Sequence, residues 1–191
     1  AGLARLGMKL PRSPGKLRVL GSLAAVRIAL RGRSPHEILH LPEMKDARVL
    51  AGMDLMMAMT PSAFFTNQNL FAVVALRMTA MSLKRGNCRV SAYGYITYAI
   101  LLLDALGDIK GGVRFARLAV TLGERLDNAG LRAKIGVIFG AFINHWDAPI
   151  ARSIVLLRNA YRHGLETGDL VYAGYALANR MFAAVVRGEA L

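Results

Sequence analysis

The sequence predicts an all-α protein built from stacked antiparallel helical hairpins. Apolar residues recur every three or four positions, and the strict alternation that marks a strand is nearly absent. Turn-forming residues separate the apolar segments, and Asn87, Asn128 and Asp169 follow one another at intervals of 41 residues. A period of about 41 residues that holds two helices is typical of a helical solenoid. An irregular helical bundle with coincidental spacing is the alternative.

Each helix is predicted from its own apolar periodicity and from the signals at its ends. We expect helices over residues 17–30, 46–59, 68–85, 90–106, 108–126, 131–146, 150–167 and 169–187. The breaks between them are Gly86-Asn87, Gly107-Asp108, Asp127-Asn128, Asp147 to Pro149 and Gly168-Asp169. Residues 1–16 are then a basic extension or linker, and residues 17–191 are the helical-repeat domain.

For three of these helices, the sequence predicts which residues face the protein interior. In the helix 17–30, the residues expected to face inward are Leu17, Leu20, Ala24 and Ile28, with Arg18 and Arg31 in water. In the helix 108–126, the inward residues are Gly112, Phe115, Ala116, Ala119 and Leu126. In the helix 131–146, the apolar stripe is Ile135, Ile138, Phe139 and Phe142. Gly136 and Gly140 lie beside that stripe, so a neighbouring helix can approach closely there.

The charge is strongly positive and unevenly distributed. There are 25 Lys and Arg against 12 Asp and Glu, a net charge of +13, and the first acidic residue is Glu37. Such a basic block can meet phosphates, anionic lipid or an acidic neighbour, and its Arg-rich character also resembles a transit peptide. Aromatic residues are not interleaved with the arginines, so a basic nucleic-acid-binding domain is an alternative that we do not favour.

Cysteine and hydropathy patterns favour a cytoplasmic segment without a membrane span. Cys88 is the single cysteine, which excludes an internal disulfide. The uncharged stretch Leu55 to Leu76 is interrupted at Thr60-Pro61-Ser62 and again at Thr66 to Asn69, so we expect two short helices there. The apolar run near the N-terminus is cut by Arg27 and does not resemble a signal peptide. Because the chain starts at Ala1, we expect a piece of a longer polypeptide or a processed form.

The sharpest chemical signal is His36-Glu37-Ile38-Leu39-His40, which spells HExxH. On a helix this pattern places two imidazoles one turn apart for zinc and a carboxylate that activates water. Pro35 and Pro42 bracket the motif and leave a helix too short for a supported metal site. The conceivable further ligands are Asp46, Asp54 and His145. A solvated or capping pair of histidines is the favoured interpretation, and a zinc metallopeptidase is the weak alternative.

Aromatic and polar side chains in the C-terminal half are candidates for protein contacts. Asn144-His145-Trp146 closes an apolar helix, where imidazole and indole side chains commonly meet free carbonyls or pack. The other candidates are Tyr161, Tyr172 and Tyr175. The methionines Met53, Met56, Met57 and Met59 are expected to fill the core rather than to form a binding surface. Phosphate-loop, GxGxxG and GxSxG motifs do not occur, so we expect no cofactor and no catalysis by this segment.

Part of the repeat pattern is similar to tetratricopeptide repeats. The turn Gly107-Asp108 and the small residues Gly112 and Ala119 follow that scheme, although the tetratricopeptide repeat is commonly about 34 residues long. Ile100 stands where that repeat has a small residue. The match therefore predicts a tetratricopeptide-like arrangement of the helices.

Several short motifs together resemble the helical-repeat region of large bacterial signalling proteins. These motifs are Ser34-Pro35 to Leu41-Pro42, Phe64-Phe65, Ser82-Leu83, Ser91 to Tyr95, Phe142 to Trp146, Gly164 to Glu166 and Gly168 to Ala176. Those proteins join a serine/threonine kinase-like domain, an AAA-type ATPase, tetratricopeptide-like helices, a GAF domain and often a histidine kinase. Asp147 stands where that family is expected to have a basic residue.

The resemblance implies a connector whose catalytic neighbours lie outside these residues. Its helices would scaffold or transmit, by holding an ATPase in an inhibited arrangement or by presenting a groove to a partner protein. Because stacked hairpins flex by small rotations, a change at one end can alter the other. The high apolar fraction also implies that part of the surface is covered, or that the isolated segment self-associates.

Overall fold

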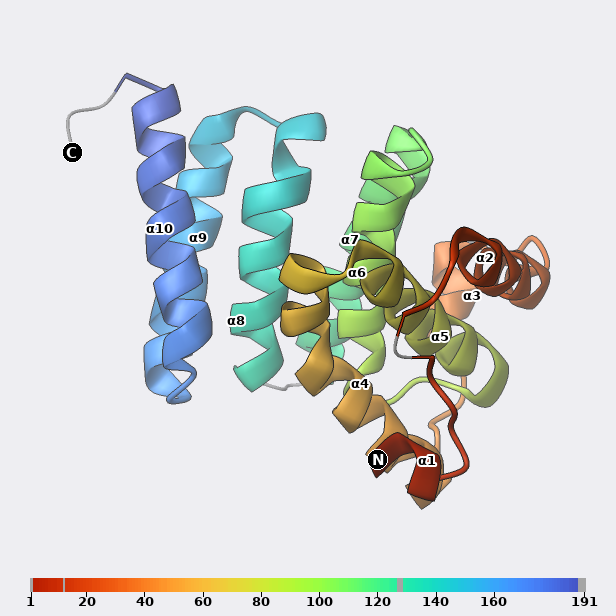
Figure 1. Cartoon of the computed structure of the whole chain (residues 1–191). Helices are drawn as coiled ribbons and strands as arrows, with labels where there is room; N and C mark the ends of the chain where they lie inside the picture. The colour runs from red at the N-terminus through yellow and green to blue at the C-terminus, as the bar shows by residue number, and fades with distance from the viewer. Residues whose placement is uncertain (1, 12, 127–128, 189–191) are drawn as a thin grey trace. The chain divides into compact units, whose positions relative to one another are not determined.

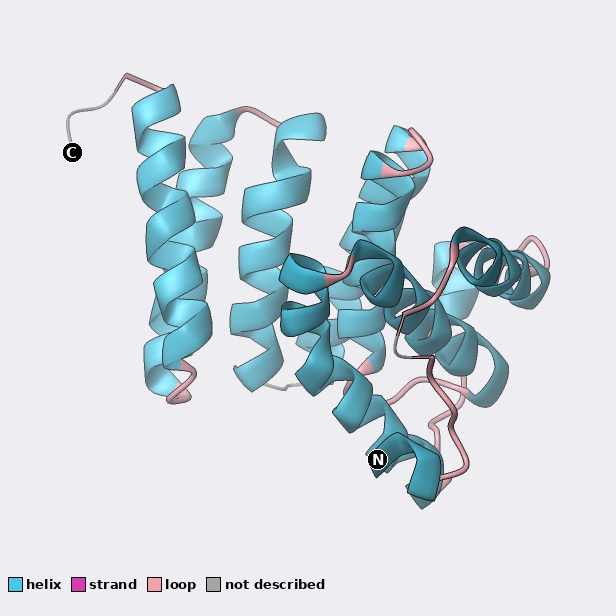
Figure 2. Ribbon diagram, in the orientation of Figure 1, coloured by secondary structure: helices cyan, strands magenta, loops and turns pink. Residues whose placement is uncertain are grey.

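The computed structural model describes residues 2–11, 13–126 and 129–188 (Figure 1). These residues form helices and loops and contain no strand beyond one isolated bridge between Glu43 and Asn87, which confirms the all-α prediction (Figure 2). Contacts divide the chain into two compact units, Ala1–Tyr98 and Ala99–Leu191, described separately below. The predicted break at Asp127-Asn128 and the basic residue Arg12 lie outside the described residues.

The helices fall close to their predicted ranges. The first unit holds α1 (Gly2–Arg5), α2 (Lys16–Leu30), α3 (Pro35–Leu39), α4 (Ala47–Thr66) and α5 (Gln68–Arg85). The helix α6 (Ser91–Asp104) spans the division between the units. The second unit continues with α7 (Ile109–Arg125), α8 (Ala129–Ile138), η1 (Phe139–Ile143), η2 (Asn144–Trp146), α9 (Ile150–Glu166) and α10 (Leu170–Val186). Most ends agree with the sequence within one or two residues.

Polar side chains fix the starts of α4, α5, α7 and α10. Asp46 accepts from the backbone N–H groups of the first turn of α4, and Asn67 does so for α5. Asp108 and Asp169 cap α7 and α10 in the same way. These caps explain why the turn signals in the sequence located the helix starts well.

The break predicted at Pro61 is wrong, because α4 continues through it to Thr66. Proline removes one backbone donor from a helix interior. Thr60 Oγ1 donates to the Met56 carbonyl at 2.7 Å, and the Phe64 ring packs edge-on against Phe71 of α5 at 5.2 Å. Packing of the last turn on α5 thus holds the helix beyond the proline.

By length and apolar composition alone, α4 is the one described helix that could cross a membrane. A third of its most apolar window is buried inside the molecule, and core helices of many proteins meet the same criteria. The absence of a membrane span stays a prediction.

The inward face predicted for α2 is wrong. Leu17 is 85% exposed, and Leu20 and Ile28 are exposed as well, whereas Val26 and Ala29 on the opposite side are buried. The helix is apolar around most of its circumference, so periodicity gave no unique face, and packing against α5 selected the Val26 side. An exposed apolar stripe remains on α2.

In the first unit a buried polar cluster joins α3, α5 and α6. Asn87 donates through Nδ2 to the Ile38 carbonyl at 2.7 Å and accepts from the Tyr95 hydroxyl at 2.8 Å. The Ser82 and Ser91 hydroxyls lie 2.7 Å apart, and Ser91 Oγ accepts from the Cys88 N–H. Burial raises the pKa of Tyr95 above its ordinary value of 10.0, against a smaller lowering effect of the Ser82 hydrogen bond. This cluster fixes residues 86–90, which join α5 to α6 and are not helical.

In the second unit helices meet at small residues. A Cβ added at Gly136 of α8 would lie 2.9 Å from the Ala160 Cβ of α9, and one at Gly164 would lie 3.0 Å from the Ala173 Cβ of α10. The close approach predicted along Gly136 and Gly140 is therefore confirmed. Figure 1 shows α8, α9 and α10 running side by side.

Two details of the predicted faces are wrong. Leu126 and Phe142 are exposed, although the remaining inward residues of the two stripes are buried or half-buried. Leu126 is the residue after α7 and has passed the packed part of the helix. Phe142 lies in η1, because the helix predicted over 131–146 changes at Phe139 to a π-helix and then to a 3-10 helix. The wider turn rotates Phe142 off the expected stripe.

Candidate functional site

The most extensive exposed apolar surface of a single described helix lies on α10. Its exposed large apolar residues are Leu170, Val171, Leu177, Met181, Phe182, Val185 and Val186. At about 3.6 residues per turn, these positions fall within one half of the helix circumference. Phe182 is 72% exposed. We call this set of residues the α10 face.

The opposite side of α10 packs within the second unit and fixes the helix in place. Tyr172, Ala173, Ala176 and Ala183 are buried there. Ala173 meets Gly164 of α9, where the missing side chain lets the two helices approach closely. Because the helix is anchored on one side by small residues, its other side is a preformed apolar surface.

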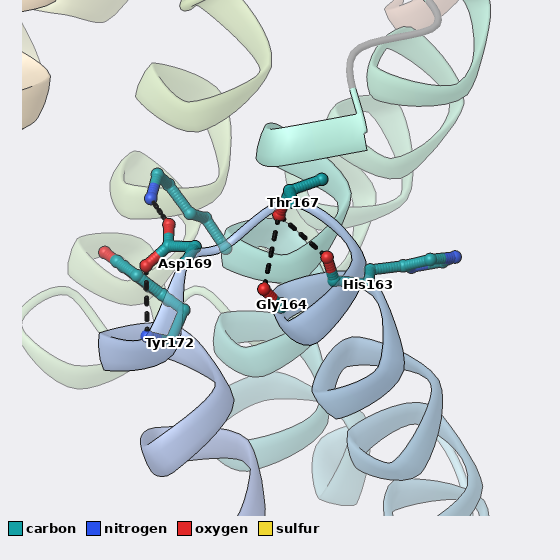
Figure 3. A network of polar contacts seen from close by, with 6 residues as sticks. His163, Gly164, Thr167, Asp169 and Tyr172 are labelled. Atoms are coloured by element: carbon teal, nitrogen blue, oxygen red, sulfur yellow. Dashed lines mark hydrogen bonds and ion pairs between the residues drawn. The ribbon is translucent and has the colours of Figure 1, made fainter.

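A polar network at the turn between α9 and α10 holds this helix pair (Figure 3). Thr167 Oγ1 donates to the His163 carbonyl at 2.7 Å. The Asp169 carboxylate accepts from the Tyr172 N–H at 3.2 Å and pairs with Lys134 of α8. The Lys134 ammonium also lies 4.2 Å from the centre of the Tyr172 ring. The network orients the start of α10 relative to α8.

Asn144, predicted as a contact residue, lies inside the molecule. It is fully buried and donates through Nδ2 to Ser153 Oγ at 2.9 Å. Within the described residues its Oδ1 atom is buried and makes no hydrogen bond. His145 and Trp146 are exposed beside it, with ring centres 5.4 Å apart. Asn144 thus anchors the turn, while the two aromatic side chains present a small surface.

The predicted tyrosines have different environments. Tyr172 is buried beneath Lys134, and the Tyr175 ring packs edge-on against it at 5.6 Å. Tyr161 is half-buried on α9. Tyr172 therefore serves the packing of the second unit rather than lying on its surface.

The predicted contact residues do not form one cluster. His145 and Trp146 precede α9, whereas Tyr172 follows it. A helix of 17 residues spans about 25 Å. The two groups thus lie near opposite ends of α9 and cannot share a small ligand.

The HExxH motif occupies a short helix in which its glutamate has another role. Glu37 accepts from the N–H and the hydroxyl of Ser34, at 2.7 and 2.8 Å, and completes a capping box. These hydrogen bonds, the backbone one first, lower the pKa of the Glu37 carboxyl. A low pKa is the opposite of what a general base near neutral pH requires.

The two histidines of the motif lie side by side at the surface. The His36 and His40 ring centres are 4.3 Å apart, and His40 Nδ1 lies 2.8 Å from the His36 carbonyl. Among the described residues, no three His, Cys, Asp or Glu side chains are grouped as metal ligands. Asp46 and Asp54, the further candidate ligands, instead pair with Arg85 and Arg89.

A shallow groove of about 180 Å³ lies between α7, α8 and α9. Gly136 of α8 and Phe139 of η1 line it, together with Arg132 and His163. The glycine that lets α9 approach α8 also leaves this space.

The sequence did not identify the α10 face or the role of Asn87. The α10 segment was predicted as a helix, but its apolar residues cover almost the whole circumference, so the buried side could not be selected. Asn87 was recognised only as a turn residue. Its contacts with Ile38 and Tyr95 join parts of the chain far apart in the sequence, which local patterns do not report.

Comparison with known proteins gives one distant relative. The hybrid signal transduction histidine kinase G of Dictyostelium discoideum is 21% identical over 136 residues, which is 70% of this chain. The matched region is 4% of the length of that protein. No family model matches the chain, and no solved structure matches it.

Proposed function

We propose that this chain is a non-catalytic helical-repeat scaffold or connector that works through protein contacts in a cytoplasmic multidomain signalling protein. The α10 face carries the proposal, because a continuous apolar surface on a well-packed helix is typical of an interaction site. The distant relative is named as a signal transduction kinase, and the match covers a small part of it. Both facts fit a segment that connects other domains.

The proposed architecture is a tetratricopeptide-like solenoid with a period near 41 residues. The helices α6, α8 and α10 begin at Ser91, Ala129 and Leu170, at intervals of 38 and 41 residues. In this arrangement α6–α7 and α8–α9 are hairpins, and α10 is the first helix of the next. In such a stack, a helix keeps one apolar side open unless a neighbouring element covers it.

The occupant that suits the α10 face is another apolar helix face. Across its 17 residues α10 carries one charged side chain, Arg180. The exposed stripe of α2, by contrast, is accompanied by Lys16, Arg18 and Arg27. Two α2 stripes would repel each other, whereas two α10 faces would not. In a solution of this chain alone, the occupant is therefore a second copy that contacts the first through α10.

Sedimentation velocity over a range of protein concentrations tests this proposal. We expect reversible association of the chain, and we expect the triple variant Leu177→Ser, Met181→Ser, Phe182→Ser to be monomeric. The matched control is Leu17→Ser, Leu20→Ser, Ile28→Ser, which removes three exposed apolar side chains from α2 and should leave association unchanged. Circular dichroism checks that both variants fold. A wild-type chain that is monomeric at every concentration, or equal effects of the two variants, would contradict the proposal.

The basic first unit supports nucleic-acid binding as a second candidate function. Residues 1–98 contain 14 Lys and Arg against 4 Asp and Glu. Phosphate contacts make such binding fall steeply with salt. Electrophoretic mobility shifts with double-stranded DNA and single-stranded RNA at several salt concentrations test this candidate. Submicromolar binding at physiological salt would favour it, and no shift at micromolar protein would exclude it.

The zinc metallopeptidase alternative has a simple test. Zinc titration by calorimetry would show tight one-to-one binding, lost in His36→Ala, if the two imidazoles held a metal. We expect no such binding, because among the described residues no third His, Cys, Asp or Glu side chain is grouped with the two imidazoles.

A further inference from the structure

A basic cavity lies within the first unit, between α2, α5 and the segment that joins α1 to α2. Its volume is about 620 Å³, which is within the range of small-molecule sites. Three cations line it, Lys9, Arg18 and Arg77. Ala25, Val73 and Leu76 form part of an apolar wall. The cavity therefore combines concentrated positive charge with a surface that suits a non-polar group.

No acidic side chain in the described part of the unit neutralises these cations. The cavity lining contains no Asp or Glu. The unit has four acidic residues, and three have partners elsewhere: Glu37 binds Ser34, Asp46 pairs with Arg85, and Asp54 pairs with Arg89. Glu43 is not among the lining residues either. The three cations thus carry uncompensated charge around one space.

Arg77 holds the edge of the cavity in place. Its guanidinium donates through Nη1 to the Lys9 carbonyl at 2.7 Å and so ties the α1–α2 segment to α5. An arginine has five N–H donors, so the others can serve a ligand. Burial, and then the nearby charge of Arg18, lower the pKa of Arg77. The negative charge of a bound anion would offset both effects, because it favours the charged form of Arg77.

We propose that this cavity binds the phosphate group of an organic phosphate, held by Lys9, Arg18 and Arg77, with the organic part against Ala25, Val73 and Leu76. Arginine suits this ligand because its planar fork matches phosphate oxygens. The first turn of α2 has no side-chain cap, and its helix dipole adds a favourable field for an anion beside Arg18. The proposal is independent of the α10 face, because all of the lining residues belong to the first unit.

Two kinds of ligand can supply such an organic phosphate group. One is a free nucleotide, whose base and sugar are comparable in size to the cavity. The other is the headgroup of a phosphorylated lipid, because Leu17 both lines the cavity and extends into solvent with Leu20. The phosphate contacts are the same in both cases, so the same substitutions test both.

Calorimetric titration of the whole chain with pyrophosphate and with ATP tests the first source. Flotation with phosphatidylcholine vesicles that contain 5% phosphatidylinositol 4-phosphate tests the second. The variants are Lys9→Gln and Arg18→Gln, which remove a cation from the cavity without removing the hydrogen bond from Arg77 to Lys9. The matched control is Arg27→Gln, which removes an exposed cation from the same helix at a position outside the cavity.

We expect binding in one of these assays, weakened about tenfold by Arg18→Gln and by Lys9→Gln and less than twofold by Arg27→Gln. Binding to the soluble probes identifies a nucleotide-like ligand, and binding only to vesicles identifies the lipid source. Equal weakening by Arg18→Gln and Arg27→Gln would overturn the proposal, because it would show general attraction to a cationic surface. Absence of binding to every probe at millimolar soluble ligand, and to the vesicles, would also overturn it.

Discussion

The two units of this chain are both helical, yet they are held together in different ways. In Ala99–Leu191, neighbouring helices approach at small residues such as Gly136 and Gly164, and the turns close with local caps. In Ala1–Tyr98, a buried polar cluster around Asn87 fastens segments that are distant in the sequence. The difference shows that helices predicted from the same kind of apolar periodicity can be held together by close helix contacts at small residues or by polar contacts between distant segments.

The units also differ in charge. The first contains 14 Lys and Arg against 4 Asp and Glu, and the second contains 11 against 8. The basic cavity lies in the first unit and the nearly uncharged α10 face in the second. Anion binding and protein contact are accordingly assigned to different units, and the following predictions test the structural side of this comparison.

The largest effect is expected from Gly86→Ala in the first unit. Gly86 has a φ of 101°, and an added Cβ would clash with the backbone carbonyl of Pro42. We expect the free energy of unfolding to fall by at least about 3 kcal/mol. Gly107→Ala is the matched control, since Gly107 has a φ of 64° but open space around it. It should cost about 1 kcal/mol.

Urea denaturation followed by circular dichroism measures both variants. Equal losses would mean that the contact between Gly86 and the Pro42 segment contributes nothing, and that the first unit is held by local turns alone.

The next largest effect is expected from Asn87→Ala. The substitution removes the side-chain donor to the buried Ile38 carbonyl and the Asn87 acceptor of the Tyr95 hydroxyl, and should cost about 3 kcal/mol. Asn144→Ala in the second unit is the control, because this buried side chain donates to Ser153 Oγ at 2.9 Å and to the Pro149 carbonyl only at 3.3 Å, and within the described residues its Oδ1 accepts no hydrogen bond. Thermal and urea unfolding should show a loss of about 1 kcal/mol for it. A larger loss of stability for Asn144→Ala than for Asn87→Ala would contradict the view that the buried polar cluster is more important in the first unit.

A pH effect is expected from Tyr95. Its pKa is raised in the folded state, chiefly by burial, so the phenol stays protonated in the folded chain when it ionises in the unfolded one. Its contribution to stability is complete below pH 10 and is lost as the pH rises further. Urea unfolding of wild type and Tyr95→Phe between pH 8 and pH 11 measures this. The stability gap between them should narrow above pH 10 by about 1 kcal/mol per pH unit. A constant gap would show that Tyr95 does not titrate differently in the two states.

The smallest effect is expected from Leu20→Ser on α2. The side chain is exposed, so the free energy of unfolding should change by less than about 0.5 kcal/mol. Val26→Ala on the opposite, buried side should cost about 1 to 2 kcal/mol. Differential scanning calorimetry measures both changes. A larger loss of stability for Leu20→Ser than for Val26→Ala would mean that the Leu20 side of α2 faces inward, as the periodicity predicted.

Sequence patterns predicted the helices well and their faces less well. Helix ends were found because Asp108 and Asp169 act locally, as caps within three residues of the groups they bind. The close approach at Gly136 was found because an amphipathic face surrounds it. The faces of α2 and α10 were not found, because both helices are apolar almost all round and packing against another part of the chain selects the buried side.

The candidate surfaces show the same limit. Asn144-His145-Trp146 was identified as a polar and aromatic group, but only the fold separates buried Asn144 from exposed Trp146. The basic cavity brings Lys9 together with Arg77, which are 68 residues apart. The sequence predicts the positive charge of this region, but it does not predict the cavity that these cations line.

The central claim is that the α10 face is a protein contact surface, and amide hydrogen exchange measured by mass spectrometry tests it most directly. We expect peptides from residues 170–186 to become more protected as the chain concentration rises from micromolar to several hundred micromolar. Peptides from α2 should exchange at the same rate throughout. Exchange in α10 that does not change with concentration, or protection that rises equally in α2, would contradict the claim.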